Sequence, residues 1–494
     1  MGNNEKHTAE IFDEKDILIQ KLQDENEYLK QQLKELKRLI FGSKSERFVP
    51  ADGSQLSLFD GPGQETQERQ TEEIKYTREK PVKEKQQPVR ASIPSHLPRV
   101  EEIVEPDHIE EGSKKIGEEI TEVLEYNPAK VYVRKIVRPK YAKANNDGIQ
   151  VAELPTLPIP RGNAGASLLA YIMVSKFIDH LPYYRQIQIF KRQDFIVSDS
   201  TLNGWFNATA KLLVPLYDTL QKQVVDCDYL QADESPIGVQ DSHKKGTLHK
   251  GYQWVYRSPI KRLVLFRYHS GRERKAPQTI LKNFNGTLQT DGYIAYKNMQ
   301  ANGKITYLAC MAHARRYFKK ALQNDKKRSE YALLKIQDLY TIERKARERE
   351  IDFETRKRYR QLYAKPILSE LETWLKKNID QTLPKSAIGE AIGYSHSLWP
   401  KLKGYIDDGK YEIDNNLIEN AIRPLALGRK NYLFAGSHNA AQNAAMFYSF
   451  FATCKVADVN PLAWLTDVLN RIPDHKANKL QELLPHNWKQ SLHQ

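Results

Sequence analysis

Two short apolar segments that each lead to an aspartate constrain the fold of this chain most strongly. Residues 229–240, Tyr-Leu-Gln-Ala-Asp-Glu-Ser-Pro-Ile-Gly-Val-Gln, are typical of a buried strand that brings Asp233 to a strand end. Residues 286–296 repeat the pattern, with Asp291 after the strand and Gly292 where the chain turns. A third acid, Glu419, lies in a predicted helix within residues 413–424. Three carboxylates suit Mg²⁺, and they could hold two ions around a phosphodiester.

Each acid alone has an ordinary explanation. Asp233 could be a simple strand-end acid, Asp291 the start of an Asp-Gly turn, and Glu419 a charge on a helix surface. The strands and helices predicted around them favour the interpretation that the three acids form one site. Residues 251–256 and 262–268 resemble a hairpin of strands, 305–310 a further strand, and 312–318 the start of a helix. Antiparallel strands followed by alternating strands and helices are the layout of a ribonuclease-H-like α/β core.

The segments around Glu419 supply further candidates. Glu419 follows Asp291 by 128 residues (419−291), and we predict a helical insertion at about 322–385 in that interval. Helical spacing places Arg423 on the same face as Glu419. Arg429 and Lys430 stand beside a turn and could clamp a phosphate.

A helical region precedes the catalytic segment. Residues 168–181 and 182–192 are predicted helices, and a turn at 193–197 leads to a third helix that begins near 198 with capping residues. This spacing is typical of a helix-turn-helix, in which Ser200, Thr201 and Asn203 would approach DNA. A purely structural helix pair is the alternative.

The N-terminal residues carry a heptad pattern. Its two series are Ile19, Asn26, Leu33 and Ile40, and Leu22, Leu29 and Leu36. This predicts a coiled coil over 1–48 that pairs the chain with a second copy, although a helix docked on its own domain has the same pattern. Residues 49–93 are rich in Gln, Glu, Lys and Pro, which favours a flexible linker.

The composition indicates which partners and which cellular compartment to expect. The net charge of +14 attracts polyanions, but a merely soluble basic protein would also have it. The cysteines Cys227, Cys310 and Cys454 have no metal spacing and fit a reducing cytoplasm. The chain begins with polar residues, and no apolar run reaches the length of a membrane helix, so we expect no membrane partner.

Four segments together resemble the transposases of the insertion-sequence 66 type, and the resemblance covers nearly the whole chain. The carriers are Tyr229-Leu-Gln-Ala-Asp-Glu-Ser-Pro, Thr290-Asp-Gly-Tyr, Ala312-His-Ala-Arg-Arg, and the long motif from Ile413 to Asn431 around Glu419. The resemblance implies a DDE site in which Asp233, Asp291 and Glu419 hold two Mg²⁺ or Mn²⁺ ions. It also implies that His313 and Arg316 assist near the scissile phosphate. The sequence leaves open whether the same element encodes accessory proteins.

One segment departs from that family. Its members usually carry a cysteine zinc knuckle between the zipper and the helical region, but no cysteine precedes Cys227 here. We therefore expect residues 94–145 to form a small β domain without zinc, since structural zinc needs about four Cys or His ligands.

The expected organisation is thus a multidomain α/β protein. The coiled coil, linker and small β domain precede a helix-turn-helix-like domain at 146–222, a catalytic domain at 223–440 and a helical region at 441–494. The expected activity is cleavage at transposon-end DNA and strand transfer into target DNA, in the nucleoid of a bacterial cytoplasm. A metal-dependent nuclease that only cuts and a non-catalytic DNA-binding regulator are the alternatives.

Overall fold

The computed structural model describes residues 140–142, 149–151, 156–160, 162–241, 247–296 and 304–491. The predicted coiled coil at 1–48, the linker at 49–93 and most of the β domain at 94–145 lie outside these residues. At the end of that domain, β1 (Lys140–Ala142) pairs antiparallel with β2 (Ile149–Val151).

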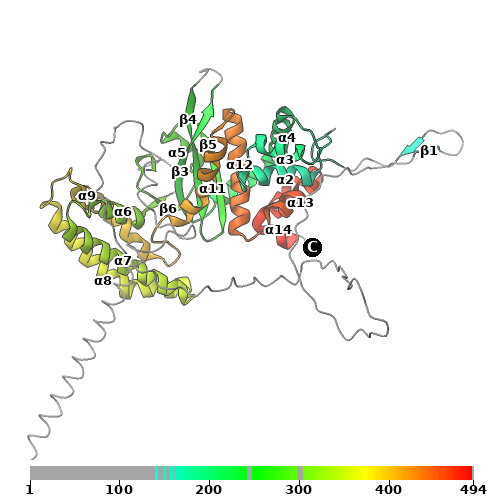
Figure 1. Ribbon diagram of the computed structural model, residues 1–494. Helices are drawn as coiled ribbons and strands as arrows, with labels where there is room; N and C mark the ends of the chain where they lie inside the picture. The colour runs from blue at the N-terminus through cyan, green and yellow to red at the C-terminus, as the bar shows by residue number, and fades with distance from the viewer. Residues whose placement is uncertain are drawn as a thin grey trace, which may run out of the picture. The chain divides into compact units, whose positions relative to one another are not determined.

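A mixed sheet occupies the middle of the catalytic region (Figure 1). Its strands are β3 (Tyr229–Gln240), β4 (Leu248–Ser258), β5 (Leu263–His269), β6 (Gly286–Thr290) and β7 (Ile305–Ala309). They lie in the order β5-β4-β3-β6-β7. The pairs β3–β4 and β4–β5 are antiparallel, whereas β3–β6 and β6–β7 are parallel. All the strands predicted here are present, but the prediction that Asp233 lies at a strand end is wrong: β3 continues past it to Gln240, because it stays paired with β4 over that length. A short strand β8 (Phe434–Ala435) also pairs with the far end of β3.

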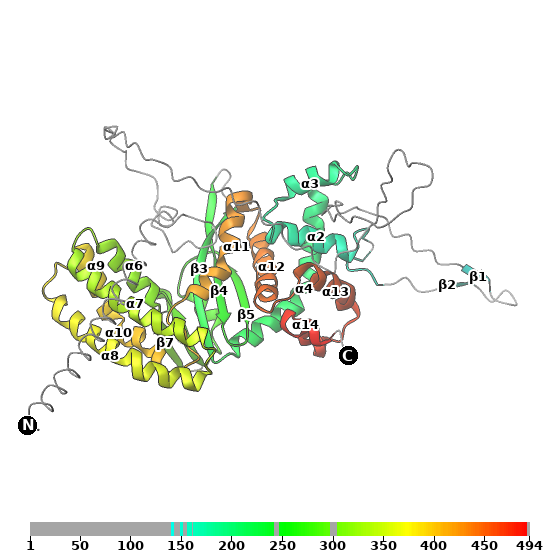
Figure 2. The ribbon, with the colours of Figure 1, turned by 60° about the horizontal axis from the view of Figure 1, so that its bottom comes forward.

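Helix α12 (His438–Val456) covers the outer edge of β5, as Figure 2 makes visible. The Phe266 N–H donates to Ser449 Oγ at 2.8 Å, and the Val264 N–H donates to Thr453 Oγ1 at 3.2 Å. The Thr453 hydroxyl in turn donates to the Val264 carbonyl at 3.1 Å. These contacts satisfy backbone groups that an open sheet edge would leave unpaired.

The helical region before the sheet contains α2 (Ala166–Phe177), α3 (Tyr183–Lys191) and α4 (Asp199–Val225). Ser198 caps α4 as expected, because its side chain accepts from the Thr201 N–H at 3.1 Å. Leu202, Trp205 and Phe206 are buried. Their side chains belong to the same hydrophobic core as the sheet, α12, α13 (Pro461–Arg471) and α14 (Pro485–Ser491), so these elements pack as one body.

A second hydrophobic core lies between helices on the other side of the sheet. Its elements are α6 (Met311–Ala321), α7 (Lys326–Glu348), α8 (Phe353–Ile379), α9 (Ala387–Ser397), α10 (Trp399–Lys403) and the 3₁₀ helix η4 (Gly404–Asp407). The helical insertion predicted for 322–385 is present and continues to Asp407. It continues because Ser386 caps α9, where its side chain accepts from the Gly389 N–H at 3.1 Å, and Ile388 and Ile392 then bury one face.

A buried ion network joins the helices of this insertion. Arg360 Nε donates to Glu343 Oε1 at 2.7 Å, and Arg356 Nη2 donates to Glu343 Oε2 at 2.7 Å. The side chains of Glu343 and Arg360 are both 0% exposed. Burial alone would raise the pKa of Glu343, but the hydrogen bonds and charges of Arg360 and Arg356 outweigh it and lower that pKa.

We predict that Glu343→Gln destabilises the protein by about 3–5 kcal/mol, because it leaves the buried guanidinium of Arg360 without its counter-charge and leaves Arg356 with only its salt bridge to Glu412. Denaturant unfolding followed by circular dichroism measures the loss. Since the pKa of Glu343 is lowered in the folded state, this stabilisation is present above the ordinary glutamate pKa and is lost as the pH falls through the folded value.

The matched control is Glu348→Gln on the same helix. Glu348 is 66% exposed and pairs with Arg344 at 3.9 Å, so its removal should change stability by less than about 1 kcal/mol. Equal effects of the two substitutions would contradict the structural role assigned to Glu343.

Candidate active site

The parallel pairing of β3 with β6 brings the two aspartates together. Gln231 of β3 is in register with Gln289 of β6, and Asp233 and Asp291 each lie two residues further along. Their Cα atoms are therefore expected at neighbouring positions across the strand pair. The two motifs, which are separate in the sequence, are therefore neighbours in the sheet.

The turn after β6 orients Asp291. Gly292 has a φ of 91°, a conformation that residues with a Cβ rarely adopt. Asp291 Oδ1 accepts from the Tyr293 N–H at 2.8 Å, and the Asp291 carbonyl accepts from the Tyr394 hydroxyl at 2.7 Å. The Asp-Gly turn and the metal-ligand interpretation of Asp291 are thus compatible, because the turn fixes the carboxylate.

The start of α11 (Asn416–Tyr432) positions Glu419. Asp414 Oδ1 accepts from the Asn416 N–H at 2.9 Å and so satisfies a backbone group in the first turn of this helix, whose N-cap residue Asn415 makes no side-chain capping bond. Two links tie this start to that of α6: the Met311 N–H donates to the Ile413 carbonyl at 3.1 Å, and the Asn415 N–H to Cys310 Sγ at 3.2 Å.

Because α6 and α11 begin side by side, their polar side chains meet. Arg316 on α6 lies 3.8 Å from Glu419 on α11, measured from Nη2 to Oε1. Burial raises the pKa of Glu419, and the Arg316 charge opposes that shift. The structure therefore brings Arg316 next to Glu419, a contact that the sequence analysis did not predict.

The carboxylates act on one another electrostatically. The pKa of Asp233 is raised well above its ordinary value by burial, and then by the charges of Glu234, Asp291 and Glu419. Burial followed by the Asp291 charge raises the pKa of Glu234 to about 7. Sequence reasoning missed Glu234, although its place beside Asp233 in a buried strand was visible. This concentration of negative charge is the kind of environment that attracts a cation.

His313 is the other polar group at the start of α6. Its Nδ1 is buried and has no hydrogen-bond partner among the described residues. Burial, followed by the nearby Arg316 charge, lowers the pKa of His313 to about 4. The imidazole is therefore neutral at pH 7 and retains hydrogen-bonding capacity for a group that enters the site.

The residues expected to read DNA at the start of α4 make local contacts. Ser200 Oγ and Thr201 Oγ1 each lie 2.8 Å from Ser198 Oγ. Asn203 Nδ2 donates to the backbone carbonyl and the carboxylate of Asp199, both at 2.9 Å. These bonds order the first turn of α4 and leave Ser200 exposed.

The cations on α11 divide into two groups. Arg423 and Lys430 are exposed, as a phosphate contact requires. Arg429 is not, since its Nη1 donates to the Pro236 carbonyl of β3 and burial lowers its pKa. Arg429 therefore braces α11 against the sheet.

The donor chemistry of the acids fits a hard divalent cation. Asp233, Asp291 and Glu419 are carboxylates, and Mg²⁺ takes only one or two of these per ion alongside water and phosphate oxygens. In the part of the chain that the structure describes, however, no group of three or more His, Cys, Asp or Glu side chains is placed so that it could hold a metal ion. The three carboxylates are ligands of the type that Mg²⁺ binds, and oxygens of a substrate would have to complete the coordination of each ion.

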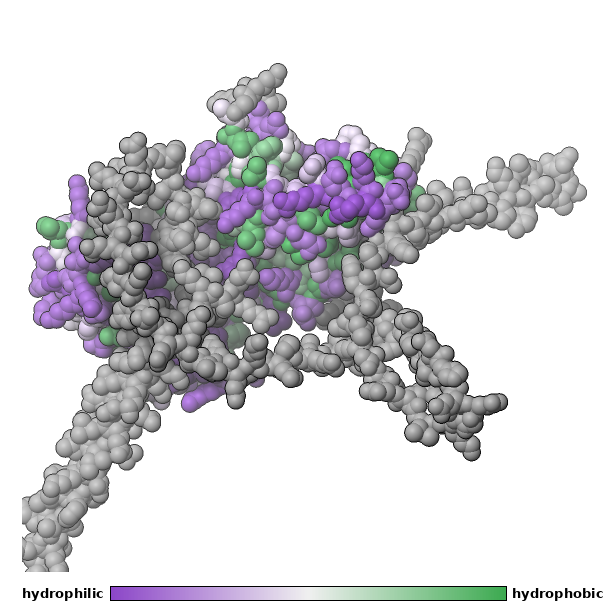
Figure 3. All heavy atoms as spheres, in the orientation of Figure 1, coloured by the Kyte–Doolittle hydropathy of each residue, from purple (hydrophilic) through white to green (hydrophobic). Residues whose placement is uncertain are grey.

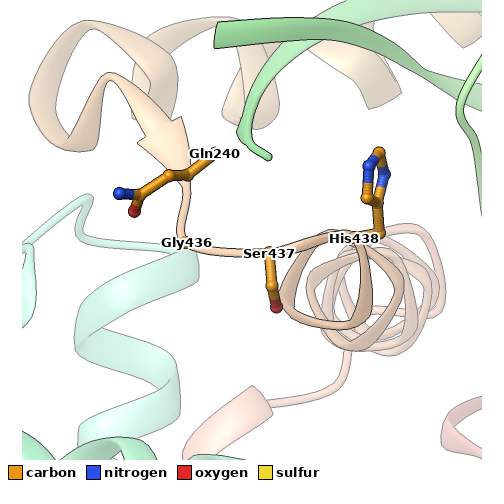
Figure 4. A pocket seen from close by; sticks show the side chains of 4 residues that line it. All are labelled: Gln240, Gly436, Ser437 and His438. Carbon is orange, nitrogen blue, oxygen red and sulfur yellow. The ribbon is translucent and has the colours of Figure 1, made fainter. Parts of the chain in front are cut away.

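A separate hollow of about 330 Å³ lies where β3 ends and α12 begins (Figure 4). It is lined by Gln240, Gly436, Ser437 and His438. Gln240 is seven residues from Asp233 (240−233), which is about 23 Å along an extended strand. The hollow is therefore distinct from the carboxylate site.

Comparisons with known proteins agree over almost the whole chain. Residues 161–443 match the family described as Transposase IS66 family, and residues 449–486 match the IS66 C-terminal element. Residues 28–101, outside the described structure, match the family described as Transposase C of IS166 homeodomain. No helix among the described residues is long and apolar enough to cross a membrane.

Relatives of similar length occur in Sinorhizobium fredii. Uncharacterized protein y4jD is 33% identical over 92% of this chain and 93% of its own length. Uncharacterized protein y4qI is 32% identical over 92% of this chain and 88% of its own length. The family match spans the sheet, the helical insertion and all three acids, and the chain belongs to the IS66 family of transposases.

Proposed function

We propose that this protein is a DNA transposase that cuts the ends of its element and joins them to target DNA, with Asp233, Asp291 and Glu419 as its catalytic acids. The observation that carries the proposal is the register of β3 with β6, which brings Asp233 and Asp291 to neighbouring positions although they lie far apart in the sequence. Asp233 and Asp291 follow paired positions on parallel strands, and after burial and the Glu234 charge, the charges of Asp291 and Glu419 help to raise the pKa of Asp233.

The order of the strands supports a ribonuclease-H-like core. Three antiparallel strands, β3 to β5, stand on one side of the sheet, and β6 and β7 continue it in parallel with β3. That is the strand layout expected from the sequence, with one acid within the first strand, one after the fourth strand and one on a later helix. Here these positions belong to Asp233, Asp291 and Glu419.

Asp233, Asp291 and Glu419 would hold two Mg²⁺ or Mn²⁺ ions. When bound, such ions stabilise the negative charge of a phosphodiester under attack and make the attacking oxygen more nucleophilic. Arg316, 3.8 Å from Glu419, adds a positive charge at the same place. The neutral His313 offers its unpartnered Nδ1 to the DNA or to a water molecule. Water would free a 3′ hydroxyl at the element end, and that hydroxyl would then attack target DNA.

A polar stripe along α11 leads from the site toward the helical region. The exposed residues at helical spacing are Asn416, Asn420, Arg423, Leu427 and Lys430. From the first to the last of them the helix rises by about 21 Å. Beside the end of the stripe, Arg185 of α3 donates to Asn431 Oδ1 at 3.0 Å.

Helix α3 extends this surface. Its residues Arg185 and Lys191 are exposed, and so is Arg192 just beyond its end. Figure 3 shows hydrophilic residues gathered over this region. We propose that DNA runs along α11 to α3, where the cations contact phosphates and order its path to the acids.

The first prediction concerns the acids. Asp233→Asn, Asp291→Asn and Glu419→Gln should each reduce nicking of element-end DNA by about 1000-fold or more, because each removes a negative ligand of the same site. Binding of the DNA should stay within a few-fold of wild type. Nicking with Mg²⁺ or Mn²⁺ and a gel-shift assay measure the two quantities separately.

The outcomes of this assay separate the alternatives. Substantial nicking by one of the three variants would remove that residue from the site. Nicking by the wild type without strand-transfer products would favour a nuclease that only cuts. DNA binding by the wild type without any nicking would favour a non-catalytic regulator.

The second prediction concerns the stripe. Arg423→Ala and Lys430→Ala should weaken DNA binding, and each should reduce the slope of log affinity against log salt by about 1, the effect of one lost phosphate contact. Lys455→Ala is the matched control, since Lys455 is also exposed but lies at the far end of α12 from β8. An unchanged salt slope in both stripe variants would place the DNA elsewhere.

A further inference from the structure

We propose that Glu234, Arg272 and Tyr293 form a clamp that holds Asp233 and Asp291 in position, and that these three are positioning residues of the reaction. This inference rests on the proposed function of the two aspartates. It concerns side chains that the sequence analysis did not assign to the site.

The first contact of the clamp lies beside Asp233. Arg272 Nε and Nη2 both donate to Glu234 Oε1, at 2.8 and 2.5 Å. The Glu234 side chain is only 2% exposed, whereas that of Arg272 is 46% exposed. The buried carboxylate therefore depends on a cation that reaches it from the loop after β5, and it has no other positive partner that bonds to it among the described residues.

The second contact lies beside Asp291. The guanidinium of Arg272 stacks over the Tyr293 ring, with its Cζ 4.0 Å from the ring centroid. The Tyr293 hydroxyl donates back to the Arg272 carbonyl at 3.0 Å. Arg272 thus holds Glu234 with its head group and Tyr293 with both its head group and its backbone.

The two residues that Arg272 joins are also the ones whose amides orient the aspartates. The Glu234 N–H donates to Asp233 Oδ1, and the Tyr293 N–H donates to Asp291 Oδ1, both at 2.8 Å. Each aspartate therefore has one carboxylate oxygen fixed by a clamp residue and the other left for a ligand. Movement of Glu234 or Tyr293 would rotate a catalytic carboxylate.

The clamp lies on the face of the sheet opposite to the expected substrate. Successive side chains of a strand point to opposite faces, so Glu234 lies on the face opposite to Asp233. Across the strand pair, Glu234 is in register with Trp254, which packs against Tyr296 at 5.7 Å between ring centroids. The clamp therefore holds the aspartates from the opposite face of the sheet. It does not compete for the metal-binding oxygens.

The test uses the full-length protein and four variants: Glu234→Gln, Arg272→Gln, the double variant, and Tyr293→Phe. Nicking of element-end DNA gives kcat and KM, and thermal unfolding confirms that each variant is folded. The two single glutamine variants should lose about 10- to 100-fold in kcat, the effect of misplacing a catalytic group by about 1 Å, while KM changes by less than about 2-fold. Tyr293→Phe keeps the stacked ring and should lose less than either.

The double variant tests whether the residues act as a unit. Glu234→Gln combined with Arg272→Gln should be no slower than the worse single variant, because either change alone already opens the clamp. Arg274→Gln is the matched control, since Arg274 is an exposed arginine of the same loop, and it should leave kcat unchanged. Multiplying losses in the double variant, or an unchanged kcat in both single variants, would overturn the clamp.

A readout without catalysis separates this inference from the proposed function. Hydrogen–deuterium exchange of the peptide over residues 287–296 should be faster in Glu234→Gln and Arg272→Gln than in wild type, and that of α12 should not change. Unchanged exchange at 287–296 would overturn the clamp whether or not the protein nicks DNA. A wild-type protein that does not nick DNA would contradict the proposed function alone.

Discussion

The parallel pairing of β3 with β6 is the contact on which the site depends. It aligns Gln231 with Gln289 and so brings Asp233 and Asp291 to neighbouring positions. The buried amides of these glutamines reinforce the pairing, since Gln231 Nε2 donates to Gln289 Oε1 at 3.0 Å and to the Asp414 carbonyl at 2.8 Å. The second bond reaches the segment that begins α11. One strand pair thereby sets the places of all three acids.

The same arrangement places like charges together in a partly buried site, which is unfavourable without a cation. Burial first, and then the charges of neighbouring acids, raise the pKa of Asp233 and of Glu419. The protein maintains the arrangement through rigid surroundings. Two hydrophobic cores flank the site, and the ion network around Glu343 joins the helices of the insertion against which α6 packs. The hydrophobic cores and the ion network therefore stabilise a site whose own acidic side chains repel one another.

Sequence patterns were sufficient for the strands of the sheet and for the helix after Asp414, because these depend on local residue types, whereas the role of the three acids stays a prediction. The patterns were insufficient where a contact joins distant segments. Arg429 donates to the Pro236 carbonyl, 193 positions away in the sequence. Its side chain therefore contacts the sheet, although its sequence surroundings predicted a phosphate contact. Arg272 lies 38 positions from Glu234, and nothing local to its loop indicated a buried partner. The coiled coil and the zinc-free β domain stay predictions.

The measurement that tests the account most directly is anomalous diffraction from Mn²⁺ in crystals of the protein bound to element-end DNA. The account predicts manganese peaks within coordination distance, about 2.0–2.5 Å, of carboxylate oxygens of Asp233, Asp291 and Glu419, next to a DNA phosphate. The peaks should vanish in the Asp233→Asn protein crystallised in the same way. Manganese bound to DNA and to other side chains, with these three carboxylates empty, would contradict it.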